Sequence, residues 1–309
     1  MIINMTQFLI GAVLLYFGAE FLIKGSKSIA IKFNISPIII GITLVAVGTS
    51  LPELIVSILA ILKNEPGIVI GNVMGSNVAN IGLVLGITAI LSPIYVPFEK
   101  IRYDMYFLMG ITIISLWFII MGNLVFWQGI VLLLLLIVYC VYIYKNNKLE
   151  IEENKLEIGL INFLLLGQVM IGIFGLALGA TLLVEGAQGI ALSLGVSSLV
   201  IGMSIVALGT SLPELAASLV AIKHGESGIV IGNVIGSNVM NIVLVLGLTI
   251  CVGNIQINYM EIIIQGFFML FSIFILFLLI KTNDRITKLS GIFLTMIYIV
   301  FLYFNFQTV

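Results

Sequence analysis

Two segments of the chain carry the same polar residues at the same spacing. The matching stretches are Gly48-Thr-Ser-Leu-Pro-Glu53 with Gly209-Thr-Ser-Leu-Pro-Glu214, and Gly75-Ser-Asn-x-x-Asn80 with Gly236-Ser-Asn-x-x-Asn241. One offset of 161 residues aligns 41–88 with 202–249, with 32 identities in 48 positions. Both copies place a carboxylate, amides and hydroxyls inside otherwise apolar segments. Burying an ionisable group in such a segment costs free energy, so a residue of this kind is a functional candidate by default. The two glutamates are therefore the first candidates for chemistry.

A glycine and a proline precede each glutamate and predict an opened helix. Pro52 cannot donate a backbone hydrogen bond, and its ring clashes with the carbonyl of Gly48 one turn earlier. Backbone carbonyls from Ala46 to Thr49 are then expected to be released from helical pairing. In a membrane such carbonyls are tolerated only where they line a polar cavity. Carbonyl, hydroxyl and carboxylate oxygens are the ligands that suit Na⁺ and Ca²⁺.

Helical spacing places hydroxyl groups beside each glutamate. Thr49, Glu53 and Ser57 recur at four-residue steps and so share one helix face. Ser50 adds a hydroxyl three residues before the carboxylate. The following segment adds a serine and an asparagine one turn apart, and the second copy repeats both patterns. The candidate side chains are Thr49, Ser50, Glu53, Ser76, Asn80, Thr210, Ser211, Glu214, Ser237 and Asn241.

Other polar residues in the apolar segments are less decisive. Four asparagines fit a ligand role and interhelical hydrogen bonding equally well; these are Asn72, Asn77, Asn233 and Asn238. Glu20 and Glu185 lie near the ends of apolar segments and do not correspond under the offset, so interfacial solvation explains them. His224, the single histidine, falls in an expected loop and is given no catalytic role.

The composition identifies the class of protein. Of the 309 residues 61% are hydrophobic and 9% charged, and the mean hydropathy is +1.28, which is typical of a polytopic membrane protein. A net charge of −1 without a basic patch gives no indication of nucleic acid as a partner. Cys140 and Cys251 lie in apolar runs far from any C-x-x-C pattern, so we expect neither a disulfide nor a metal cluster. The first apolar run is expected to span the membrane and not to be a cleaved signal peptide.

Ten segments are long enough to cross about 30 Å of hydrocarbon, five in each copy. They are 5–23, 35–62, 67–91, 104–121, 124–144, 159–184, 196–222, 229–252, 258–280 and 288–306. With ten alternating spans, twelve of the thirteen Lys and Arg residues fall on one side of the membrane and only Lys63 on the other. The positive-inside rule then places the rich side in the cytoplasm and both termini outside.

An odd number of spans in each copy makes the two halves enter the membrane in opposite directions. We therefore predict an all-α polytopic membrane protein of ten transmembrane helices, arranged as two inverted five-helix repeats. The first repeat covers 1–148, a cytoplasmic linker covers 149–158, and the second repeat covers 159–309. The polar stretch Lys145–Glu157 contains an acidic run that could bind a regulatory cation, but a solvated linker explains it more simply.

At these residues the chain resembles the cation/calcium exchanger superfamily, and in particular the compact prokaryotic sodium/calcium exchangers. Members of that family carry Gly-Thr-Ser-Leu-Pro-Glu followed by Gly-Ser-x-x-x-Asn in each of two repeats, and both elements stand here in full. The resemblance covers nearly the whole chain. It implies an antiporter of the plasma membrane that exchanges Na⁺ for Ca²⁺, and not an enzyme.

The resemblance also implies roles for individual residues. The central Ca²⁺ ligands would be Glu53 and Glu214, with the backbone carbonyls of Thr49 and Thr210. Flanking Na⁺ sites would use the side chains of Ser50, Ser76, Ser211 and Ser237 and the carbonyls of Ala46 and Ala207, and Asn80 and Asn241 would close the centre. Several relatives, including the potassium-dependent branch, have an aspartate at the position of Asn241. Its absence here puts potassium dependence in doubt.

Three alternatives stay open at the level of sequence. Protons could replace Na⁺ on the same fold, because Glu53 and Glu214 could be protonated in a site of low dielectric; the hydroxyls and carbonyls favour Na⁺, since a proton does not need them. A gated cation channel fits the strict duplication less well than alternating access does. An intramembrane hydrolase would need a base beside its serines. We expect no cofactor, a lipid bilayer as the surroundings, and function as a monomer.

Overall fold

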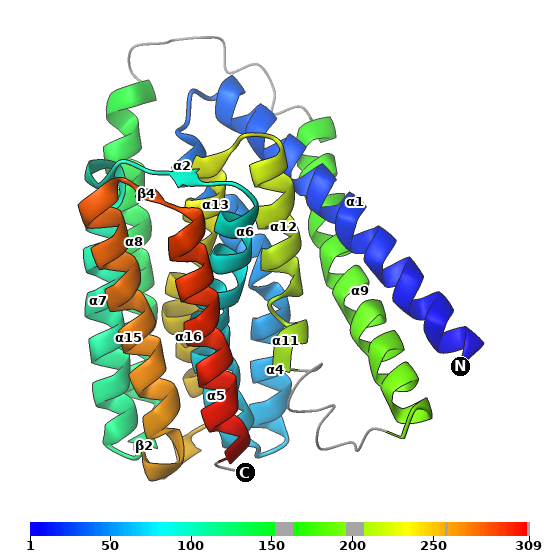
Figure 1. Ribbon diagram of the computed structural model, residues 1–309. Helices are drawn as coiled ribbons and strands as arrows, with labels where there is room; N and C mark the ends of the chain where they lie inside the picture. The colour runs from blue at the N-terminus through cyan, green and yellow to red at the C-terminus, as the bar shows by residue number, and fades with distance from the viewer. Residues whose placement is uncertain (152–162, 196–206, 257–258, 308–309) are drawn as a thin grey trace.

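The computed structural model describes residues 1–151, 163–195, 207–256 and 259–307, and almost all of them are helical (Figure 1). The long uninterrupted helices are α1 (Ile2–Lys32), α7 (Phe98–Ile120), α8 (Phe126–Ile151), α9 (Phe163–Ser193), α15 (Tyr259–Asn283) and α16 (Lys288–Gln307). Within the described residues, eight helices are long and apolar enough to cross a membrane, or nine if one bent pair counts as a single span. The predicted all-helical membrane class is confirmed. Of the ten predicted spans, three begin outside the described residues: 159–184, 196–222 and 258–280.

The outer helices expose large apolar side chains on their surfaces. Phe174 is 67% exposed, Trp117 57% and Leu134 54%. Helices whose outward faces are this apolar are unfavourable in water and favourable in lipid, which satisfies no backbone group and so selects helices. The exposed faces therefore agree with a bundle whose solvent is the bilayer.

A broken span opens the first copy of the duplicated stretch. It consists of α2 (Pro37–Ile40), the π-helical turn η1 (Gly41–Val45), α3 (Ala46–Thr49) and α4 (Leu51–Leu62), with a bend of 41° at the break. The predicted opening is thus present, because Pro52 lacks the N–H that would continue the ladder. In the second copy α11 (Ala207–Gly209) and α12 (Leu212–Lys223) are separated in the same way. Residues 202–206 of the predicted motif lie outside the described ranges.

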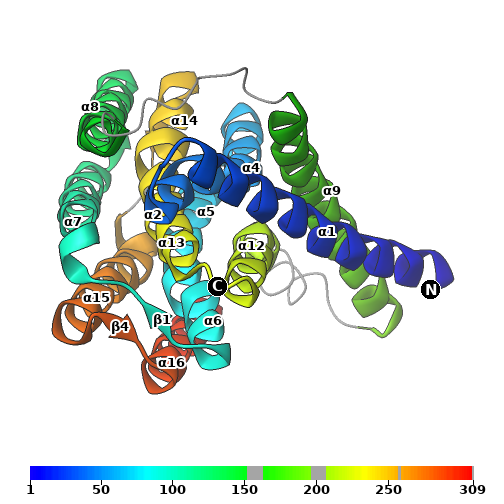
Figure 2. The same cartoon turned by 90° about the horizontal axis from the view of Figure 1, so that it is seen from above.

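Two interrupted helices form the centre of the bundle. One comprises α5 (Pro66–Ala79), η2 (Asn80–Leu85) and α6 (Gly86–Leu91), and the other α13 (Ser227–Met240), η4 (Asn241–Leu246) and α14 (Gly247–Val252). Burial distinguishes them from the outer helices: 78% and 83% of their spanning stretches are buried, against 28% for α16. Figure 2 shows α5 and α13 side by side, with the other helices around them.

The helices α1 and α9 pack directly against each other along one side of the bundle (Figure 2). Glycines recur at seven-residue steps on their facing sides; these are Gly11, Gly18 and Gly25 in α1 and Gly172, Gly179 and Gly186 in α9. A Cβ atom on Gly172 would lie 2.5 Å from the backbone N of Leu22, so only glycine allows this approach. The hydropathy pattern did not predict this pairing, although the glycine period is visible in the sequence.

Two short antiparallel ribbons join loops at opposite ends of the bundle (Figure 1). β1 (Ile94–Tyr95) pairs with β4 (Arg285–Ile286), and β2 (Asn123–Leu124) pairs with β3 (Ile255–Gln256). Each ribbon therefore links one half of the chain to the other. The 161-residue offset carries β1 onto β3. The ribbons were not part of the predicted all-α fold, because strands of two residues leave no periodicity in a sequence.

Several helices extend beyond the predicted spans. α1 reaches Lys32 where the predicted span ended at 23, and α9 reaches Ser193 where it ended at 184. α8 continues to Ile151, so the first residues of the predicted linker 149–158 are helical, and the rest lie outside the described residues. Hydropathy marks where the hydrocarbon ends, whereas a helix can continue into the aqueous phase with polar residues on its surface.

Candidate functional site

Each duplicated glutamate lies in the first turn of the helix that follows a break. Glu53 belongs to α4 and Glu214 to α12, and both side chains are 0% exposed. Pro52 and Pro213 occupy the same first turn, where the helix that begins there needs no N–H from the proline for its own hydrogen bonds. The unpaired N–H groups at a helix N-terminus favour a nearby carboxylate. The repeated sequence thus places one buried acid from each half at a positive helix end.

The backbone at the two breaks is nearly the same. Ser50 has φ −85° and ψ 4°, and Ser211 has φ −86° and ψ 1°. The Ser50 N–H still donates to the Ala46 carbonyl at 3.0 Å. The expectation that the Ala46 carbonyl is released from helical pairing is therefore wrong for this conformation. The carbonyl that loses its helical donor is that of Gly48, because that donor would be the absent N–H of Pro52.

Hydroxyl groups of the two halves meet across the centre. Thr49 Oγ1 lies 3.3 Å from Ser237 Oγ, and Ser76 Oγ lies 3.5 Å from Thr210 Oγ1. The 161-residue offset converts each of these pairs into the other. Four of the predicted ligands are thus brought together in two symmetry-related pairs that join α3 to α13 and α5 to the second break.

A further contact brings the first break to the second glutamate. Ser50 Oγ donates to Glu214 Oε1 at 3.5 Å. Ser211 Oγ, the equivalent group of the second copy, is buried without a hydrogen-bond partner among the described residues. Ala207 starts α11, and its side chain lies outside the part of the structure that is described. Thr210 is half-buried, whereas the other predicted polar side chains of the site are buried.

Asn72 and Asn233 fasten the glutamate-bearing helices to the central helices. Asn72 Nδ2 donates to the Glu53 carbonyl at 3.0 Å and to Ser57 Oγ at 2.9 Å. Asn233 repeats both contacts with the glutamate and serine of its own half, at 3.4 and 3.1 Å. Of the two roles left open for these asparagines, the structure shows interhelical hydrogen bonding.

Replacing Asn72 by alanine is expected to lower the stability of the protein more than its Ca²⁺ transport. The change removes two interhelical hydrogen bonds, each worth about 0.6 to 1.7 kcal/mol in a membrane protein. We expect a lower thermal unfolding midpoint in detergent and a smaller loss of Ca²⁺ flux. Asn77→Ala is the matched control, since among the described residues Asn77 Nδ2 donates only within its own helix, to the Val73 carbonyl at 2.6 Å. Equal destabilisation by both substitutions would contradict the fastening role.

Asn80 and Asn241 each begin a π-helical turn. They are the first residues of η2 and η4, and both are 0% exposed. Asn80 Nδ2 donates to Asn238 Oδ1 at 3.4 Å, which is a contact between the halves. Short π-helical stretches inside α-helices are frequent at functional sites. The asparagines were candidates from their spacing, whereas the π-turns that position them left no signal in the sequence.

Several buried polar atoms at the centre have no hydrogen-bond partner among the described residues. They are both carboxylate oxygens of Glu53, Oε2 of Glu214, Oδ1 of Asn77 and Asn80, Nδ2 of Asn238, and both amide atoms of Asn241. Buried polar groups without partners are costly and require an explanation. Most of these atoms are oxygens, which are the ligands that Na⁺ and Ca²⁺ prefer.

The described residues contain no group of three His, Cys, Asp or Glu side chains that could hold a metal ion. The candidate site therefore combines two carboxylates with hydroxyls and amides. This set differs from the carboxylate-rich or imidazole-rich sites that hold a resident metal, and it suits ions that must also leave.

Glu20 and His224 lie away from this site and contact each other. Glu20 pairs with Lys24 at 3.0 Å and lies 3.0 Å from His224 Nε2, and its side chain is 16% exposed. Interfacial solvation is therefore not the explanation for Glu20, which joins α1 to the turn after α12. Glu185 is exposed, as expected for a residue near a span end.

The chain is similar to known proteins over nearly its whole length. A family model described as sodium/calcium exchanger protein matches residues 3–145 and 164–307. An uncharacterized membrane protein of Methanocaldococcus jannaschii is 39% identical over 300 residues, which cover 97% of each chain. The sodium/calcium exchanger MaX1 of Methanosarcina acetivorans is 33% identical, again over 97% of each chain. A solved structure of the sodium-calcium exchanger NCX_Mj is similar with a TM-score of 0.85 and 36% identity, over 97% of each chain.

Proposed function

Because the chain belongs to the sodium/calcium exchanger family, we propose that it exchanges Na⁺ for Ca²⁺ across the plasma membrane by alternating access. Its membership makes it a multi-pass membrane protein and a cation/Ca²⁺ exchanger, in a family of transporters and not in an enzyme class. The choice of Na⁺ as the coupling ion rests on the composition of the site.

The observation that carries the proposal is the set of buried oxygens without hydrogen-bond donors. Glu53 and Glu214 contribute carboxylate oxygens, and Asn80 and Asn241 contribute amide oxygens, all from fully buried side chains. A Ca²⁺ ion placed among them would offset both negative charges and satisfy the lone pairs. We assign the Ca²⁺ site to these residues and to the carbonyls of Thr49 and Thr210.

The hydroxyl pairs around the glutamates favour Na⁺ over H⁺ as the counter-ion. A proton needs only a carboxylate oxygen, whereas Na⁺ needs several oxygen ligands at once. We assign the flanking Na⁺ sites to the hydroxyls of Ser50, Ser76, Ser211 and Ser237 and to the carbonyls of Ala46 and Ala207. The contacts of Thr49 with Ser237 and of Ser76 with Thr210 support this assignment, because they bring hydroxyls from both halves together.

Exchange follows from the sharing of the two carboxylates. Na⁺ and Ca²⁺ compete for the same oxygens, so both cannot be bound at full strength together. An empty site would leave two anions unpaired in a medium of low dielectric, which disfavours return of the unloaded carrier. With three Na⁺, as the family resemblance implies, the loaded site would carry about one positive charge, and transport would depend on voltage.

The duplicated contacts of the two halves support alternating access. We propose ten transmembrane helices in two inverted repeats, 1–148 and 159–309, joined by the linker 149–158. The paired hydrogen bonds of Asn72 and Asn233, and the two ribbons at opposite ends of the bundle, are what inverted repeats would produce. Each half would then expose the common site to one side of the membrane.

Labelling of single cysteines is expected to place the N-terminus and the end of α8 on opposite sides of the membrane. Figure 1 shows the N-terminus toward one end of the bundle and the C-terminal end of α8 at the other. In a background without Cys140 and Cys251, a membrane-impermeant maleimide should label Ile2→Cys from outside and Lys145→Cys only after permeabilisation. Labelling of both cysteines in intact cells would contradict the proposed orientation, in which both termini are external.

Uptake of ⁴⁵Ca²⁺ into proteoliposomes tests the proposed function. An outward Na⁺ gradient should drive uptake about tenfold or more above the gradient-free control, and an outward H⁺ gradient alone should drive none. Uptake driven by H⁺ without Na⁺ would establish proton exchange on the same fold. Rapid Ca²⁺ entry that needs no counter-ion and does not saturate would instead indicate a gated channel. Reconstitution at one chain per vesicle tests whether the monomer suffices.

A further inference from the structure

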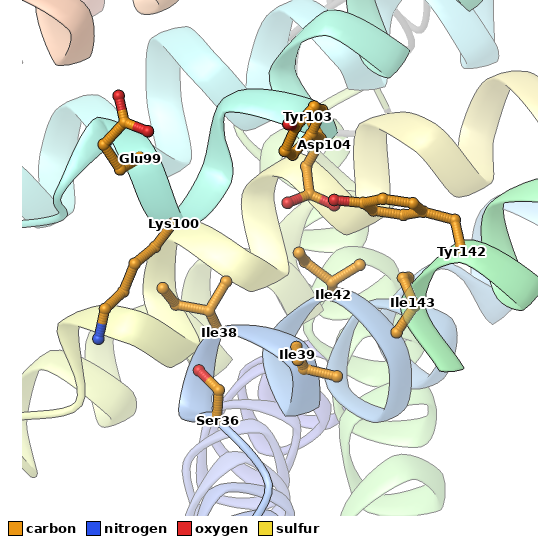
Figure 3. Close-up of a pocket in the computed structure, with 10 residues that line it drawn as sticks. All are labelled: Ser36, Ile38, Ile39, Ile42, Glu99, Lys100, Tyr103, Asp104, Tyr142 and Ile143. Carbon is orange, nitrogen blue, oxygen red and sulfur yellow. The ribbon is translucent and has the colours of Figure 1, made fainter. Parts of the chain in front are cut away.

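A cavity of about 360 Å³ lies at one end of the bundle, between α2–η1, α7 and α8 (Figure 3). Its volume falls within the roughly 300 to 1,000 Å³ that small-molecule pockets occupy. The apolar wall is made by Ile38, Ile39, Ile42 and Ile143, and two tyrosine rings add to it. The cavity is separate from the central site, because none of its lining residues belongs to the set assigned to Na⁺ and Ca²⁺.

One buried carboxylate lines this cavity. Asp104 is 6% exposed, and its Oδ1 accepts a hydrogen bond from the Tyr139 hydroxyl at 2.9 Å. The ring of Tyr139 is itself held by stacking on Phe107, with 4.4 Å between the ring centroids. Figure 3 shows the Asp104 carboxylate and the Tyr142 side chain pointing toward each other. The acid is therefore fixed in position at the wall of the cavity.

No Lys, Arg or His side chain among the described residues forms an ion pair with Asp104. The second acid on the rim, Glu99, is already paired with Arg102 at 2.6 Å. Lys100 and Glu99 both point away from the Asp104 carboxylate in Figure 3. A buried carboxylate that faces only neutral donors is costly, and a cation in the cavity would offset that cost.

Asp104 is not a requirement of the duplicated fold. The residue 161 positions later is Gln265, whose amide donates to Asn305 Oδ1 at 2.6 Å in the second half. The equivalent position of the second half is thus occupied by an uncharged side chain. The carboxylate belongs to one end of the molecule only, which argues for a specific role there and not for helix packing.

The walls of the cavity select the kind of cation. Ca²⁺ takes about six to eight oxygen ligands, and Asp104 offers this cavity a single buried carboxylate among isoleucines. Tyr103 and Tyr142 present their rings, 5.9 Å apart, and such rings attract organic cations. A primary ammonium group on an apolar body satisfies all of these features: its N–H groups reach the carboxylate, and its carbon chain covers the isoleucines.

We propose that this cavity binds an alkylammonium ion, with Asp104 as the counter-ion. The ammonium group can come from a soluble amphiphilic amine or from the ethanolamine headgroup of a phospholipid. The position of the cavity, where α2 and α7 begin and α8 ends, places it near a membrane surface within reach of either source. The site is independent of the exchange of Na⁺ for Ca²⁺.

Binding of n-hexylammonium to the purified full chain in detergent tests the proposal. Isothermal titration at pH 7 should show one saturable site, and n-hexanol, which has the same body without the charge, should bind at least about tenfold more weakly. Asp104→Asn should weaken hexylammonium binding at least about tenfold. The matched control Glu99→Gln should stay within about twofold, because Glu99 is paired with Arg102. Equal affinity of Asp104→Asn and the parent chain, or of hexanol and hexylammonium, would overturn the proposal.

A second variant keeps the test decisive if Asp104→Asn does not fold. Ile39→Trp fills the cavity and leaves the carboxylate in place, so it should also weaken binding at least about tenfold, and unchanged affinity would overturn the proposal. Native mass spectrometry from vesicles of equal phosphatidylethanolamine and phosphatidylcholine then identifies the source. Preferential retention of phosphatidylethanolamine, lost in Asp104→Asn, supports the lipid. Equal retention of phosphatidylethanolamine and phosphatidylcholine, together with intact hexylammonium binding, supports the soluble amine.

Discussion

Glu53→Gln and Glu214→Gln are each expected to reduce Ca²⁺ transport by about 100-fold or more while folded protein remains in the membrane. Glutamine keeps the volume and hydrogen-bonding capacity of the side chain but removes one of the two charges that offset Ca²⁺. Removing one partner of a buried ionic contact costs about 3 to 5 kcal/mol, and each 1.4 kcal/mol corresponds to about tenfold in affinity. ⁴⁵Ca²⁺ flux per reconstituted chain measures the loss.

Two controls separate a lost ligand from a lost fold. Glu185→Gln makes the same chemical change at an exposed position of α9 and is expected to leave flux within about twofold of the parent. Size-exclusion profiles and unfolding midpoints in detergent should be similar for all three variants. Near-normal Ca²⁺ flux in Glu53→Gln or Glu214→Gln would remove that residue from the proposed site.

Gly172→Leu is expected to abolish the packing of α1 against α9 and to reduce the yield of folded protein by about tenfold or more. A Cβ atom at this position would lie 2.5 Å from the backbone N of Leu22 and 2.9 Å from the Gly18 carbonyl oxygen. Backbone atoms cannot rotate away as a side chain can, so the two helices would have to separate. Overpacking costs about 1 to 3 kcal/mol even where side chains can adjust. Fluorescence-detected size exclusion after expression measures the folded fraction.

Gly167→Leu is the matched control on the same helix. A Cβ atom on Gly167 meets nothing within 4 Å among the described residues, so leucine should be accommodated there. Leucine is a good helix former, and the comparison therefore isolates the backbone contact from helix propensity. Equal yields for Gly172→Leu and Gly167→Leu would show that the glycine contacts do not hold the pair together.

The sequence alone determined the membrane class and identified Glu53 and Glu214 as the candidate ion ligands. Burying Glu53 and Glu214 in apolar segments is so costly that their repetition needs a functional reason, whatever the arrangement of the helices. The break before each glutamate was equally predictable, because Pro52 removes a hydrogen-bond donor by covalent chemistry alone. Both properties are local, and a local property can be read from neighbouring residues.

Only the tertiary structure decided which groups meet across the halves. Thr49 and Ser237 are 188 positions apart, and their 3.3 Å contact depends on how α3 packs on α13. The choice between ligand and fastening roles for Asn72 depended on the same packing, since its amide reaches a carbonyl 19 residues away. Side-chain types and spacing do not contain this information.

Sequence patterns also could not predict the backbone contacts between helices or the cavity. The seven-residue glycine period of α1 and α9 allows close helix approach but does not identify the partner helix. The close approach of Gly172 to the backbone of Leu22 depends on how the two helices pack in the folded chain. Asp104 gave no signal in the sequence because it lies at a span end, where solvation is the ordinary expectation for an acid. Its 6% exposure beside a cavity arises because α2, α7 and α8 converge around it, and convergence of distant elements is what a folded chain adds to its sequence.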